Sequence, residues 1–130
     1  MRPFRYCLDP LFLASGLLYA LNRLCLAPRW GAAAPFLTNH IGDVLLIPCA
    51  LPVLLWLQRL AGLRTHDLPP TPGEIGGTLV LWAVLFEVAF PRFAGRGVGD
   101  PLDLLAYAGG ALFASFAWAL HHRWSAPTLA

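Results

Sequence analysis

An apolar chain carries a few acidic side chains and one histidine at positions where they could bind a cation or relay a proton. Asp43 follows His40 by three residues, and Asp103 stands near the start of another apolar run. Glu87 lies inside a third such run. Carboxylate oxygens are ligands for hard cations such as Mg²⁺, and a His–Asp pair suits metal binding or proton transfer. The sequence therefore predicts a ligand-binding or proton-relay site, with Asp43, Glu87 and Asp103 as possible metal ligands.

Glu87 is the most informative of these residues, because an ionised carboxylate is costly inside a membrane. A charged side chain at the centre of a membrane-spanning helix costs roughly 2.5–3.5 kcal/mol, and less near the interface. We therefore expect Glu87 to face other helices and to have a partner, for which Arg23 is the candidate at similar depth. A purely structural ion pair, or snorkelling of the side chain to the interface, is an equally open interpretation.

Five further polar residues complete the candidate set: Asn22, Arg23, Arg92, Asp100 and Tyr107. Asp100, Asp103 and Tyr107 can share one face of a helix, because residues three and four apart are neighbours there. The two aspartates can equally be helix caps, and Tyr107 an interfacial aromatic residue. Arg23 or Arg92 has the charge and shape to hold a phosphate. His40 and Asn22 also have structural alternatives, His40 as an interfacial histidine and Asn22 as a residue of helix packing.

The composition of the chain indicates a membrane protein. Of its 130 residues, 58% are hydrophobic and only 12% are charged, and the mean hydropathy is +0.62. A soluble domain this small needs a charged surface, so lipid is the expected solvent. The net charge of +2, without interleaved aromatic and basic residues, gives no indication of nucleic-acid binding. The three cysteines are far apart, and an odd number argues against a closed disulfide framework.

Four apolar runs are long enough to cross a membrane as helices, which takes about 20 residues each. We predict an all-α, four-helix membrane bundle that forms a single domain, with spans at about 10–27, 40–61, 72–90 and 101–123. Thr71 and Glu74 have the spacing of a capping box, and Pro28 and Pro91 are expected to end the first and third spans. Proline also falls inside the second span, where membrane bundles tolerate a kink.

A four-span topology gathers the polar candidates at one end of the bundle. The end of span one, the start of span two, the end of span three and the start of span four share a membrane face. Five arginines on one side against four on the other weakly favour cytoplasmic termini. A signal peptide cleaved near residues 31–34 is an alternative, against which Asn22 and Arg23 count because they interrupt the apolar run.

Several segments, taken in order, are similar to a known family. They are Asn22, Asp43–Pro48, Phe86–Pro91 and, most strongly, Asp100–Gly110. Together they resemble the small bacterial four-span proteins labelled magnesium citrate secondary transporter. The resemblance implies a bacterial inner membrane and, as partners, Mg²⁺ or another divalent cation and a small anionic ligand. A homodimer would supply the eight spans that a larger transporter architecture needs.

The second half of the chain also resembles the VanZ-like family, associated with glycopeptide resistance. The matching residues are Glu87, Arg92, Asp103 and Gly110, while Tyr107 stands where that family has an asparagine. This resemblance implies an enzyme or accessory factor that acts on a lipid-linked substrate.

The sequence leaves three functions open and assigns no reaction. The first is binding or movement of a small ion or an ion–carboxylate ligand at the polar end. The second is the VanZ-like role, and the third is a structural or assembly role in which polar residues only hold the helices together. No phosphate-binding loop, nucleophile elbow or zinc-protease motif occurs in the chain. We favour the first function.

Overall fold

The chain is a four-span membrane protein, and the part that the structure describes is helical without any strand. The structure is a computed structural model that describes residues 3–95 and 100–125. After a 3₁₀ turn at Tyr6–Leu8, the helices are α1 (Pro10–Leu21), α2 (Ala27–Trp30), α3 (Pro35–Leu60), α4 (Pro72–Val84), α5 (Phe90–Ala94) and α6 (Pro101–Ser125). A π-helical turn joins α1 to α2, and another joins α4 to α5. Four of the resulting helices are long and apolar enough to cross a membrane: Pro10–Trp30, Pro35–Leu60, Pro72–Phe93 and Pro101–Arg123. The predicted all-α membrane fold is confirmed.

Side-chain caps stand at the beginnings of α1 and α4. The Asp9 carboxylate accepts from the first backbone N–H groups of α1, and it also accepts a buried hydrogen bond of 2.9 Å from Nε1 of Trp118 on α6. The capping box predicted at α4 is present, with Thr71 N donating to Glu74 at 2.7 Å and Glu74 N donating to Thr71 at 3.2 Å. Both caps satisfy N–H groups that a helix start leaves without partners.

The first and third spans do not end at Pro28 and Pro91, contrary to the expectation from the sequence. Each helix passes through its proline and continues for a few residues. A proline lacks a backbone N–H and clashes with the carbonyl four residues before it. The chain accommodates both prolines with a wider π-helical turn directly upstream, at Asn22–Leu26 and at Leu85–Ala89. The wider turn makes room for the ring, so the helix goes on.

The second span begins earlier than predicted and contains two prolines. α3 starts at Pro35, before the expected start at His40, and runs unbroken through the buried Pro48 and Pro52. Pro48 has no N–H to offer to the carbonyl of Val44, four residues before it. That carbonyl is therefore free of its usual helical partner.

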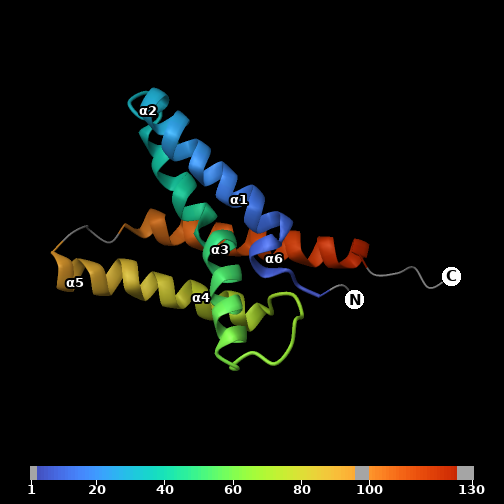
Figure 1. The fold of residues 1–130 in the computed structure, drawn as a ribbon. Coiled ribbons are helices and arrows are strands. Elements are labelled where there is room, and N and C mark those ends of the chain that lie inside the picture. Colours follow the sequence, from blue (N-terminus) through green and yellow to red (C-terminus); the bar gives the residue numbers. More distant parts are fainter. Residues whose placement is uncertain (1–2, 96–99, 126–130) are drawn as a thin grey trace.

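α3 crosses α6 and makes its most extensive contact with it (Figure 1). At the crossing, a Cβ added to Gly110 would overlap the Val44 carbonyl group, whose carbon would lie 2.8 Å away. The Cα of Gly110 thus packs directly on the carbonyl that Pro48 leaves free. Further along, Ile47 and Trp118 are buried in the core between the same two helices. α1 packs on α3 and α4 packs on α6, so the crossing holds two helix pairs together (Figure 1).

Replacing Gly110 with alanine is expected to destabilise the bundle. The added Cβ meets backbone atoms of Val44, which cannot move aside without separating α3 from α6. Overpacking of this kind costs typically about 1–3 kcal/mol. The melting temperature of the purified protein in detergent would measure the loss.

Gly109→Ala is the matched control for this substitution. A Cβ at Gly109 meets nothing within 4 Å, and alanine favours a helix more than glycine does. The control should therefore be neutral or slightly stabilising. Equal effects of the two substitutions would contradict the close crossing.

Candidate cation-binding site

His40, Asp43 and Asp103 converge at the polar end of the bundle. Nδ1 of His40 lies 3.4 Å from Oδ2 of Asp43 and 3.2 Å from Oδ1 of Asp103. One ligand atom from each residue lies within 4.8 Å of the others, and all three side chains are half-buried. The ring of Phe36 packs at an angle on the imidazole, with 4.4 Å between the ring centroids. The structure thus assembles one nitrogen and two carboxylate ligands from two different spans.

The helix crossing explains why these residues meet. His40 and Asp43 are three residues apart on α3, so their side chains lie on the same face. Asp103 lies in the first turn of α6, two helical turns before Gly110. Because Gly110 is held against Val44, and Val44 directly follows Asp43, the crossing brings the two aspartates to one place.

Glu87 and Tyr107 flank this cluster. Tyr107 is only 4% exposed and lies close enough to Asp43, Asp103 and Glu87 to interact with their charges. Glu87 also interacts with the charge of Asp103 and with the backbone of Asp100. Three carboxyl groups therefore share one region. In the set of three possible ligands, however, the histidine takes the place that the sequence prediction gave to Glu87.

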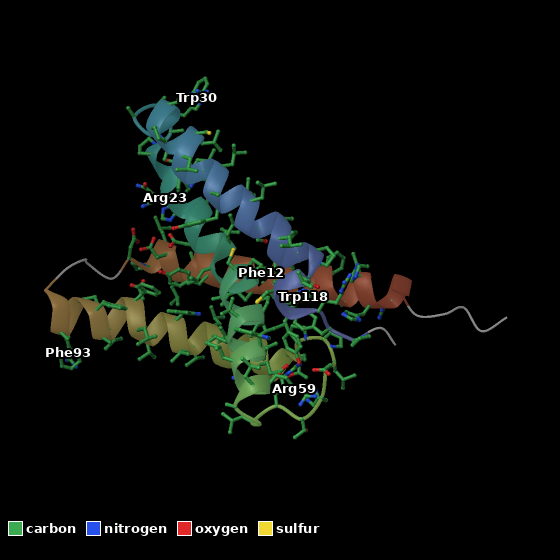
Figure 2. The ribbon with its side chains drawn as sticks, viewed as in Figure 1. Phe12, Arg23, Trp30, Arg59, Phe93 and Trp118 are labelled. Atoms are coloured by element: carbon green, nitrogen blue, oxygen red, sulfur yellow. The ribbon has the colours of Figure 1, made fainter. Side chains whose placement is uncertain are left out.

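The predicted ion pair between Arg23 and Glu87 is wrong. Among the described residues, the ion pairs of the polar end are those of His40 with its two aspartates, and neither Arg23 nor Arg92 takes part in one. Both arginines are exposed, and Figure 2 shows Arg23 at the outer edge of the bundle. Arg23 directly follows the buried Asn22 on the π-helical turn, and it lies at the exposed side of that residue.

Asp100 is a helix cap. Its Oδ1 accepts a hydrogen bond of 2.9 Å from the backbone N–H of Leu102, in the first turn of α6. The structural alternative for Asp100 is thereby confirmed. Asp103, the other aspartate of this segment, instead directs its carboxylate to His40.

Asp43 also lines a cleft of about 320 Å³ beside the cluster. The side chains that matter most in its wall are Tyr19, Asn22, Arg23, Asp43, Phe86 and Tyr107. Asn22 is 1% exposed, and its Nδ2 donates a hydrogen bond of 2.9 Å to the carbonyl of Thr38. Its Oδ1 has no hydrogen-bond partner among the described residues, although buried polar atoms are nearly always hydrogen-bonded. The sequence marked Asn22 as a candidate but gave no sign of this unpaired oxygen.

Comparison with known proteins adds no name to this site. No family model matches the chain, and it matches no curated protein and no solved structure. The two family resemblances noted from the sequence therefore stay predictions.

The opposite end of the bundle holds a buried arginine that the sequence analysis did not single out. Arg64 is 4% exposed, and Nε and Nη2 hold the Glu74 carboxylate at 2.9 and 3.4 Å. Nη1 donates to the Tyr6 hydroxyl and to the His66 carbonyl, and Nη2 donates to the Leu68 carbonyl. An arginine has five N–H donors, and these five acceptors use them all. The loop is thus closed around a fully satisfied guanidinium group.

Asp67 and Tyr6 belong to the same network, outside the membrane-spanning segments. The Tyr6 hydroxyl donates to Oδ1 of Asp67 at 2.5 Å, and Nε of Arg59 donates to the same oxygen at 3.0 Å. These hydrogen bonds, of which the one from Tyr6 has the largest effect, hold the pKa of Asp67 below its usual value of 3.8. Burial and the bond to Asp67 raise the pKa of Tyr6 above 10.0. A charged Asp67 and a neutral Tyr6 are therefore favoured near neutral pH.

This network predicts a loss of stability in acid. A carboxylate whose pKa is lowered by folding contributes stability above its unfolded pKa, and this stability is lost as the pH falls through the folded value. For Asp67 the loss is expected as the pH drops below about 3.8. Melting temperatures of the wild-type protein and of Asp67→Asn, recorded from neutral pH downward, would measure it. The variant should have a shallower acid dependence, and identical curves would contradict the role of the hydrogen bonds.

Proposed function

We propose that this membrane protein binds a small cation, and specifically a divalent metal ion, at His40, Asp43 and Asp103. The observation that carries the proposal is the convergence of three ligand atoms within 4.8 Å. They come from two spans and from positions sixty residues apart in the chain, so local helix capping does not account for them. A metal ion would join α3 to α6 at the polar end.

The charge balance of the cluster supports a positively charged ligand. Two carboxylates share one imidazole, and both approach the same nitrogen, Nδ1 of His40. Glu87 adds a third carboxyl group close by. Carboxylates that share a site of low dielectric repel one another, and a bound cation removes that repulsion.

The donor set favours a transition metal ion over Mg²⁺. Mg²⁺, which carboxylates alone suggested, takes oxygen ligands and keeps several of its waters. An imidazole nitrogen with two carboxylates suits Zn²⁺ or Mn²⁺ as well or better. Three protein ligands also leave coordination positions for water or for part of a second ligand. We expect Mn²⁺ and Zn²⁺ to bind more tightly than Mg²⁺.

Thermal stability in detergent, measured with increasing Mn²⁺, Zn²⁺ or Mg²⁺, tests the proposal. A ligand at 100 times its Kd stabilises the folded state by about 2.7 kcal/mol, which raises the melting temperature by several degrees. Asp43→Asn and Asp103→Asn keep the size of each side chain but remove its charge. Each variant is expected to lose most of the metal-dependent shift.

Asp100→Asn is the matched control. It removes a carboxylate from the same end of the bundle, and asparagine caps a helix as well as aspartate does. This variant should keep the metal response. A wild-type protein that no metal stabilises, or an undiminished shift in both Asp43→Asn and Asp103→Asn, would overturn the proposal. The cluster would then be a purely structural link between two helices.

A further inference from the structure

We infer that the cleft beside the His40–Asp43–Asp103 cluster binds a small organic ammonium ion that carries at least one N–H group and an apolar body. The ammonium group would contact Asp43, which faces both the cleft and the cluster. A metal ion and the ammonium ion would then compete for one carboxylate. The competition rests on the proposed metal binding, whereas the ammonium site rests on the cleft alone.

The unpaired oxygen of Asn22 indicates which kind of ligand the cleft takes. The side chain is held by the hydrogen bond from Nδ2 to the Thr38 carbonyl, so Nδ2 is a donor and Oδ1 is left as an acceptor. Asn22 lines the cleft, and a ligand N–H group that reaches this buried oxygen would supply the hydrogen-bond donor that it lacks. A protonated amine supplies an N–H group and a positive charge for Asp43 at once. A quaternary ammonium ion supplies the charge without the donor.

Aromatic side chains supply another part of the cleft wall. Tyr19, Phe86 and Tyr107 all line it, and the ring centroids of Phe86 and Tyr107 are 6.4 Å apart. Aromatic rings attract cations and pack well against an apolar body. The volume of about 320 Å³ falls at the lower end of the range for small-molecule sites.

An anionic ligand fits the cleft less well. Asp43 would repel it, and the unpaired Asn22 oxygen is an acceptor that an oxyanion cannot use. Among the residues that the structure describes, Arg23 is the one charged group in the wall that would attract an anion, and it is exposed. Its effect therefore has opposite signs for the two kinds of ligand. Arg23 should weaken the binding of an ammonium ion and strengthen that of a phosphate or carboxylate.

Binding of 2-phenylethylammonium to the full chain in detergent, followed by calorimetry, is the first measurement. Its N,N,N-trimethyl derivative has the same charge and apolar body but cannot donate to Asn22. We expect the derivative to bind about tenfold more weakly, as the loss of one charged hydrogen bond implies. No binding of 2-phenylethylammonium, or equal binding of both compounds, would overturn the inference and leave the metal site untouched.

Gly42→Leu tests the place of binding. Gly42 lines the cleft, and a Cβ added there makes an ordinary contact of 3.6 Å with Tyr19, so the backbone accepts a side chain. The rest of the leucine fills the cleft without replacing any residue of the metal cluster. This variant should bind the amine roughly tenfold more weakly or worse while Mn²⁺ still stabilises it. Gly109→Leu, at an exposed position with no neighbour within 4 Å of the Cβ, is the control and should keep both ligands.

Two further variants complete the test. Phe86→Leu alters an exposed ring of the wall, and it should weaken amine binding about threefold to tenfold. Arg23→Gln should strengthen amine binding about twofold to fivefold. In the wild-type protein, Mn²⁺ should weaken amine binding, because both ligands use Asp43. Unchanged amine affinity in Gly42→Leu would overturn the inference. If Gly42→Leu binds neither the amine nor Mn²⁺, the test passes to Phe86→Leu, and unchanged amine affinity in that variant would overturn the inference. Weaker amine binding in Arg23→Gln would also contradict the inference, because loss of a positive charge should not weaken the binding of a cation.

Discussion

The close crossing of α3 and α6 is the constraint on which the rest of the structure depends. Pro48 deprives the Val44 carbonyl of its helical partner, and the missing side chain of Gly110 lets α6 approach that carbonyl. Because Asp43 precedes Val44 and Asp103 lies two turns before Gly110, this contact holds the two segments that carry the carboxylates next to each other. Helices in lipid gain little from the hydrophobic effect, so close backbone packing is a main source of their association. The fold and the candidate site therefore have the same cause.

The two ends of the bundle treat buried polar groups in opposite ways. At one end, Arg64 uses all five of its donors on acceptors of the N-terminal segment, its own loop and the start of α4. At the other end, two aspartates share one nitrogen of His40, and no described residue forms a hydrogen bond with the Asn22 oxygen. The Arg64 network shows that this chain can pair every polar group of a buried network where no ligand has to bind. The incomplete network is the better place for a ligand.

Local features of the fold follow from the sequence, and the arrangement of the site does not. The four spans and the caps formed by Thr71 and Asp100 depend on neighbouring residues, and all were recognisable in the sequence. The choice of His40 over Glu87 in the cluster depends on how each helix is rotated about its axis. In lipid, the outer face of a span is as apolar as its inner face, so hydrophobic periodicity does not reveal that rotation. The burial of Arg64 was missed for a related reason, since it depends on contacts with distant parts of the chain.

The two π-helical turns link the prolines to the polar end. A π turn holds one residue more than an α-helical turn, so it rotates the side chains that follow it by about 100° about the helix axis. Both turns lie next to the cleft, and they contain Asn22 and Glu87. If Pro28 and Pro91 served only to end the helices, the chain would leave the helix at each of them, yet both helices continue. Proline thus acts in two ways in this bundle: inside α3 it frees a carbonyl for the crossing, and in the other two spans it widens the helix where polar side chains turn inward.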